Sequence, residues 1–147
     1  MPSAYEMEEI HALHGAEGER TVEIHAKDEL PFAALVFKTH AEPHVGDVSY
    51  FRILSGSVAN GQEVYNATRD VVEKLNHLAI PLGRERVEVA RLHAGDVGCV
   101  AKLRNTHTND TLSTREHPVR LPPVAFPESL VHFAVHATSR DAEEKLQ

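Results

Sequence analysis

The sequence has 147 residues, of which 41% are hydrophobic and 25% charged, a composition that suits one globular domain with flanking segments. Its single cysteine, Cys99, excludes an internal disulfide and a zinc site built from cysteines. The net charge is −7, but residues 1–30 carry −6 of it, whereas residues 31–121 have a net charge of +1. A basic face on the central segment is therefore compatible with the acidic total.

Residues 1–30 show no sustained hydrophobic period and are acidic and punctuated by glycine. We interpret them as a flexible linker in which Thr21 to His25 can form a short edge strand. No segment resembles a signal peptide, and the longest apolar run, Phe32 to Phe37, is too short to span a membrane. We therefore expect a cytoplasmic protein without a membrane partner.

From Pro31 the chain consists of short, partly alternating runs separated by turn residues. The predicted strands are Phe32 to His40, Val48 to Ser55, Glu63 to Asn66, Val71 to Ile80, Arg86 to Leu92, Val97 to Leu103 and His117 to Leu121. In the second of these, Phe51 and Ile53 share one face. Many short strands at close spacing predict an all-β fold, an antiparallel barrel or sandwich, over residues 31–121.

Gly56 and Gly61 have the spacing of the two glycines of a phosphate-binding P-loop. That loop needs a lysine and then a serine or threonine after the second glycine, whereas Gln62 and Glu63 stand there. Asn60 and Gly61 lie between two alternating runs, and both residue types tolerate positive φ. We therefore predict a hairpin turn and no nucleotide site.

Residues 122–147 form the last segment. Residues 128–137 alternate between apolar and polar side chains, which predicts a strand. "SRDAEEKLQ" then has the features of a helix start, with Ser139 as the cap and acidic residues in the first turn.

The eleven histidines and the lone cysteine offer no constellation for catalysis or metal binding. The close histidine pairs are His11 and His14, His40 and His44, and His132 and His136, and none lies in the HExxH context of a helical zinc site. No nucleophile elbow or glycine-rich dinucleotide turn is present. Cys99 lies in an apolar run, which is typical of a buried small residue. We predict no catalytic residue and no metal.

Three ordered motifs resemble elongation factor G around its domain II. They are "PFAALVFKTHAEPHVGDVSYFRILSGSVANGQEVYN", "HAGDVGCVAKLRNTHTNDTLS" and, at the entry to domain III, "FPESLVHFAVHATSRDAEEKL". The resemblance implies a translation-factor β-barrel at 31–121, a preceding linker from a GTPase domain at 1–30 and the start of domain III at 122–147. GTP and magnesium would belong to that GTPase domain, so the chain itself would hold no cofactor and be no enzyme.

The same resemblance implies a ribosome-docking module that binds small-subunit ribosomal RNA and rests against its own GTPase domain and domain III. The intact protein would couple GTP hydrolysis to translocation. The candidate ribosomal RNA contacts are Pro43, His44, Val45, Gly46, Arg52, Ser55 and Gly56. His44 and Arg52 would meet phosphates, while Pro43 and Gly46 would shape the backbone. A plainer interpretation is that Pro43 and Gly46 simply make a turn.

Three alternatives stay open at this point. "VVEKLNHLAIPLGRERVEV" departs from the common family pattern, which favours a paralogue that acts in ribosome recycling or protection. Two others belong to different classes: a histidine-based metalloenzyme, and a stand-alone barrel that binds a small ligand in its interior. The last would need polar inward positions, whereas Leu35, Phe37, Phe51 and Ile53 suggest a filled core.

Overall fold

The computed structural model describes residues 10–14, 20–83, 85–131, 133–134 and 136–138. All regular secondary structure in these ranges is β-strand. The strands are β1 (Ile10–His14), β2 (Arg20–Ile24), β3 (Ala33–Glu42), β4 (Gly46–Ser55), β5 (Val58–Ala59), β6 (Glu63–Asn66), β7 (Val71–Lys74), β8 (Ala79–Leu82), β9 (Glu85–Glu88), β10 (Arg91–Leu92), β11 (Val97–Ala101), β12 (Thr111–Ser113) and β13 (Val119–Arg120).

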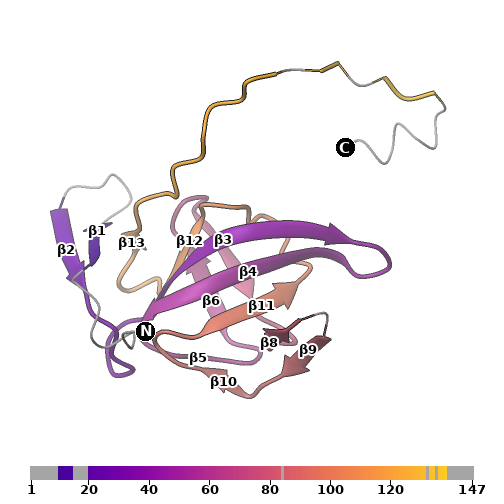
Figure 1. Ribbon diagram of the computed structural model, residues 1–147. Helices are drawn as coiled ribbons and strands as arrows, with labels where there is room; N and C mark the ends of the chain where they lie inside the picture. The colour runs from indigo at the N-terminus through magenta and orange to yellow at the C-terminus, as the bar shows by residue number, and fades with distance from the viewer. Residues whose placement is uncertain (1–9, 15–19, 84, 132, 135, 139–147) are drawn as a thin grey trace.

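The main sheet has eight strands in the order β7-β6-β12-β3-β4-β11-β8-β9, with every neighbouring pair antiparallel. The short strands β5 and β10 form a separate antiparallel pair. Figure 1 shows the long hairpin of β3 and β4 crossing the barrel and extending beyond it. This is the antiparallel β-barrel that the sequence predicted.

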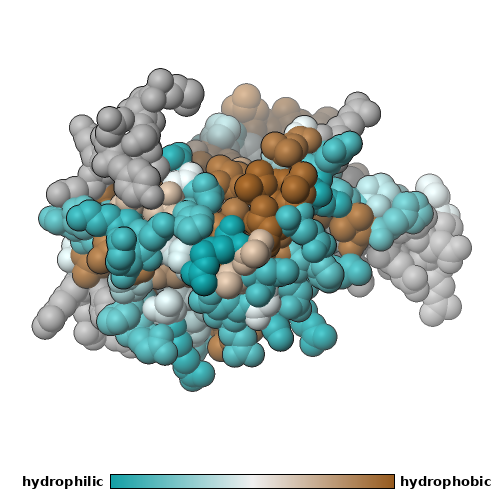
Figure 2. Space-filling view, turned by 90° about the horizontal axis from the view of Figure 1, so that it is seen from below, coloured by the Kyte–Doolittle hydropathy of each residue, from teal (hydrophilic) through white to brown (hydrophobic). Residues whose placement is uncertain are grey.

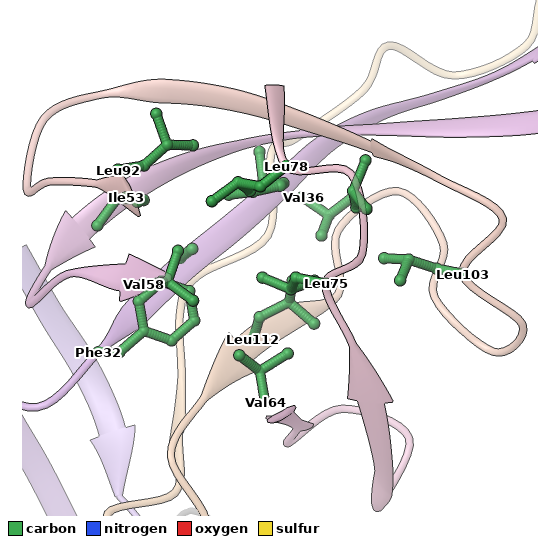
Figure 3. Packing of buried hydrophobic residues seen from close by; sticks show 13 residues of the cluster. Phe32, Val36, Ile53, Val58, Val64, Leu75, Leu78, Leu92, Leu103 and Leu112 are labelled. Carbon is green, nitrogen blue, oxygen red and sulfur yellow. The ribbon is translucent and has the colours of Figure 1, made fainter. Parts of the chain in front are cut away.

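The barrel interior is filled by apolar side chains from strands of both sheets. Figure 3 shows them pointing toward one another across the barrel. The cluster comprises Phe32, Ala34, Val36, Phe51, Ile53, Val58, Val64, Leu75, Leu78, Leu92, Val100, Leu103 and Leu112, each at most 8% exposed. Such packing supplies the main hydrophobic stabilisation of the domain and leaves no polar interior for a small ligand.

The inward face of β3 differs from the sequence prediction. Phe32, Ala34 and Val36 face the core, while Leu35 packs on the outer side and Phe37 is 37% exposed. The register between β3 and β4 shifts between Val36 and Lys38, which is a β-bulge at Phe37. The difference at Leu35 precedes this bulge. Ala33, Leu35 and Phe37 form a second apolar row on the opposite face of the strand, and alternation alone does not decide which row faces the core.

Two predicted single strands are each divided in the structure. The run from Val71 to Ile80 becomes β7 and β8, and the run from Arg86 to Leu92 becomes β9 and β10. His77, with φ +56°, lies in the first break. A left-handed residue reverses the chain within a few positions, so an uninterrupted apolar pattern can still contain a turn.

The N-terminal segment is more structured than the linker that the sequence suggested. The expected edge strand is present as β2, but β1 also forms, and both join β13 in a three-stranded sheet of order β13-β1-β2. Ala12 and Val119 of this sheet pack with Ala33 of the barrel. The alternating Ile10 and Ala12 place an apolar face on the barrel, so these residues form ordered strands and not the flexible segment that was expected.

The C-terminal segment leaves the barrel after Leu121, whose side chain is the last buried one in the described part of the chain. Its described residues run away from the barrel in Figure 1 and form no strand, so the strand predicted for 128–137 is wrong there. Leu130 is 96% exposed and Phe133 is 86% exposed. An extended segment becomes a strand only beside a partner edge. The predicted helix start at 139–147 lies outside the described residues.

Candidate nucleic-acid interface

The turn between β3 and β4 carries the first four predicted contact residues. Val45 N donates to the Glu42 carbonyl at 3.2 Å, while His44 and Gly46 have φ values of +65° and +92°. Pro43 and His44 are exposed. The tip is tied to the barrel because Lys102 N donates to the carbonyl of Asp47 at 2.7 Å. The turn is thus a fixed projection that presents polar side chains to solvent.

The remaining predicted contacts lie elsewhere. Arg52 is half-buried in the middle of β4, and Ser55 is 2% exposed at its far end. Because β4 has ten residues, its two ends are about 30 Å apart. Gly56 is buried, and a Cβ on it would lie 2.6 Å from the Leu30 carbonyl oxygen. The structure therefore does not bring the seven predicted residues together. Ser55 and Gly56 are buried, and they contribute to the packing of the barrel.

The Asn60–Gly61 turn exists, but it does not join paired strands. Gln62 N donates to the Ala59 carbonyl at 3.1 Å, and φ is +79° at Gly61. Positive φ at the second central residue alone is typical of a type II turn, which splays its flanking strands. Accordingly β5 pairs with β10, whereas β6 pairs with β7 and β12. The hairpin prediction is corrected to a turn between strands with different partners.

A groove of about 830 Å³ opens where several turns converge. Its walls come from the β3–β4, β5–β6 and β7–β8 turns, from β9 and from the end of β11. The lining residues are His44, Val45, Asn60, Gly61, Lys74, Asn76, His77, Ala79, Arg86, Glu88, Cys99, Val100, Ala101 and Lys102. Two of the predicted contact residues, His44 and Val45, are therefore on its rim.

Charged groups beside the groove are arranged around Arg86. Its guanidinium donates to Glu42 at 2.7 Å, and the Tyr50 hydroxyl donates to the same carboxylate at 3.3 Å. The hydrogen bond from Arg86 lowers the pKa of Glu42, and the same bond raises the pKa of Arg86. Nearby, His77 Nδ1 lies 2.9 Å from Glu88. Both carboxylates are thus occupied by neighbouring side chains.

The base of the groove is formed by buried side chains, of which Cys99 is the one with a reactive group. Cys99 is fully buried in a small cluster with Val48 and Ala79. Burial raises the pKa of the Cys99 thiol, which keeps it protonated. A neutral buried thiol is a poor nucleophile, so Cys99 contributes packing at this site.

The described residues contain no group of three histidine, cysteine or acidic side chains that can hold a metal ion. His40 and His44 acquire no further ligand among them, and His132 lies outside them. Within the same ranges, no helix is long and apolar enough to cross a membrane.

A family model described as elongation factor G domain 2 matches residues 31–115. The chain belongs to the elongation factor G domain 2 family. Elongation factor G of Dehalococcoides mccartyi is 36% identical over 146 residues, which is 99% of this chain and 21% of that protein. A solved structure from Thermus thermophilus has a TM-score of 0.67 and 30% identity, and covers 80% of this chain and 18% of that one. The chain thus spans about a fifth of the length of this curated relative.

Sequence reasoning missed the basic side chains of the groove, namely Lys74, Arg86 and Lys102. Each lies beside a turn or a strand end and appears in sequence as an isolated surface charge. Their charge indicates that they are exposed, but only the strand order places them beside the β3–β4 turn. No local pattern in the sequence predicts that these three side chains lie close together.

Proposed function

We propose that this chain is the ribosome-docking barrel of a translational GTPase like elongation factor G. Its match to elongation factor G domain 2 over residues 31–115 carries the proposal. The intact protein would couple GTP hydrolysis to translocation, with GTP and magnesium held in a GTPase domain. In this proposal the barrel docks on the ribosome while catalysis belongs to the GTPase domain, and the filled core gives the docking surface a rigid support.

The β3–β4 turn is the part of the predicted contact set that best suits ribosomal RNA. Pro43 and His44 are exposed, and hydrogen bonds on both sides of the tip fix its shape. A preformed turn contacts a phosphate backbone without a large ordering cost. Arg52 is half-buried and can add charge from the adjacent strand, whereas Ser55 and Gly56 support the barrel from within.

Protein partners would occupy other surfaces of the barrel. Exposed large hydrophobic side chains on its strands are Phe37, Val72, Leu82, Val87 and Val97. Figure 2 shows hydrophobic residues gathered at the centre of the face seen from below. Such patches favour contact with other domains. We assign them to the GTPase domain and domain III of the intact protein.

Co-sedimentation with small ribosomal subunits tests this function. The chain should bind weakly at low salt, and binding should fall as salt rises because phosphate contacts release counterions. His44→Glu combined with Arg52→Glu should reduce the bound fraction. His117→Glu combined with Arg115→Glu makes the same charge change at exposed positions away from the turn, and should leave binding intact. Unchanged co-sedimentation of the first double variant would show that the contact edge lies elsewhere.

A further inference from the structure

The groove beside the β3–β4 turn has a positive rim within an acidic chain. Lys74, Arg86 and Lys102 line it together with one carboxylate, Glu88. His77 lies 2.9 Å from that carboxylate. Arg86 is held by Glu42, whereas neither lysine forms an ion pair in the described part of the chain. Both lysines are exposed. Two cationic side chains are thus available to an anionic ligand.

The walls that carry these lysines are held by backbone hydrogen bonds. Gly61 N donates to the Leu75 carbonyl at 2.7 Å, and Leu78 N donates to the Asn60 side chain at 3.1 Å. These bonds join the β5–β6 turn to the segment after Lys74. At Lys102, the backbone N donates to the Asp47 carbonyl at 2.7 Å, which joins the end of β11 to the β3–β4 hairpin. The groove is therefore preformed, which limits the entropic cost of binding.

The rim, and not the base of the groove, selects the ligand. Ala79, Cys99 and Val100 at the base are each at most 3% exposed, so their side chains offer almost no surface for a ligand to cover. The contacts that remain are the two exposed lysines, which favour an anion. A nucleotide chain carries a phosphate on every residue of its backbone, so it can meet both lysines without a particular base sequence.

We propose that this groove binds the backbone of an RNA strand, with Lys74 and Lys102 each contacting a phosphate. These residues extend the contact surface from the β3–β4 turn across the barrel to β7 and the end of β11. The choice of RNA rests on the proposed function; the anionic character of the ligand rests on the groove itself.

Fluorescence anisotropy of a fluorescein-labelled oligouridine, titrated with the whole chain, tests the proposal. Each phosphate contact to a single strand contributes about 0.7 to the slope of log K against log salt. Lys74→Ala with Lys102→Ala should therefore lower the slope by about 1.4 and weaken binding about tenfold near 200 mM salt, and more at lower salt. Lys74→Arg with Lys102→Arg keeps both charges and should restore binding.

Lys27→Ala with Arg115→Ala is the matched control, because it removes two exposed charges outside the groove. Equal losses in the control and the lysine variant would overturn the proposal, as would no binding by the unaltered chain near 50 mM salt. Competition by oligoglutamate of equal charge, as effective as RNA, would assign the groove to an acidic protein. If RNA binding depends on the two lysines but the chain does not co-sediment with ribosomal subunits, the proposed function alone is refuted. If the chain co-sediments but RNA binding does not depend on the lysines, the groove proposal alone is refuted.

Discussion

Gly56 is a position at which a single methyl group should damage the barrel strongly, because the groups in its way are backbone. It has φ +70°, and a Cβ there would lie 2.6 Å from the Leu30 carbonyl oxygen and 2.7 Å from both Cα and N of Phe32. All three atoms belong to the backbone, so no side-chain rotation relieves the overlap. Gly56 N also donates to the Lys27 carbonyl at 2.9 Å. This contact fastens the segment before β3 to the end of β4.

Gly56→Ala should therefore lower the free energy of unfolding by about 3–5 kcal/mol. The left-handed conformation costs an alanine about 1–2 kcal/mol. Displacing the Leu30–Phe32 backbone should disturb the hydrogen bond to Lys27, with a net loss of about 1 kcal/mol, and should loosen the packing of Phe32, which costs a further 1–2 kcal/mol or so. That total is a large share of the roughly 5–15 kcal/mol that stabilises a typical domain.

Gly61→Ala provides the control, because Gly61 has a similar φ of +79° but no atom within 4 Å of the position that a Cβ would take. Only the conformational cost of about 1–2 kcal/mol should remain. Urea unfolding followed by far-ultraviolet circular dichroism measures both variants, since the chain has no tryptophan. Equal destabilisation by the two substitutions would refute the argument that backbone contact at Gly56 matters beyond φ.

Two further predictions concern buried and exposed polar groups. Asn66 is fully buried; its amide nitrogen donates to Asp110 at 3.0 Å, and its amide oxygen accepts from Arg69 N at 3.0 Å. Asn66→Ala should therefore lower the free energy of unfolding, measured in urea, by about 3 kcal/mol. Exposed Asn105→Ala should change stability by less than about 0.5 kcal/mol, and similar losses in both would contradict the role of the network. The hydrogen bond from Ala94 N, followed in size by the one from His93, lowers the pKa of Asp28 below its usual value of 3.8. The ionised Asp28 therefore stabilises the fold above pH 3.8, and this contribution is lost as the pH falls through the pKa of the folded state. Asp28→Asn should flatten the acid limb of the thermal midpoint against pH, and an unchanged limb would exclude this contribution.

The strands could be predicted from the sequence where apolar and polar residues alternate and the apolar ones are the buried ones. Phe51 and Ile53 alternate in sequence and face the core, because β4 is regular along this stretch. The prediction failed on β3 because both faces of that strand are apolar, so alternation did not decide whether Leu35 or its neighbours Ala34 and Val36 face the core. It also failed at β1, since Ile10 and Ala12 give too short an apolar pattern to stand out in an acidic segment, and tertiary packing on Ala33 decides their structure.

The candidate site was predictable only in its local part. The β3–β4 turn follows from proline and glycine in sequence, because those residues reverse a chain at fixed positions. Ser55 and Gly56 lie at the opposite end of β4 from that turn, since the ten residues of the strand separate them. The groove escaped prediction altogether, since Lys74 and Lys102 meet through the order of strands in a sheet that no local pattern specifies.

Backbone conformation gives a separate reason to regard the groove as more than a gap between turns. The non-glycine residues with positive φ in the described part of the chain are His44, Asp70, His77, Lys102 and Asn109. Three of these line the groove. Asparagine, aspartate and histidine tolerate the left-handed region comparatively well, whereas lysine at φ +63° does not share that tolerance. Glycine at position 102 would remove the strain and also the charge. Strained residues cluster at binding sites because surrounding packing sustains them there, and the bond from Lys102 N to Asp47 does so here. The strain thus points to the same lysine that the electrostatics of the groove select.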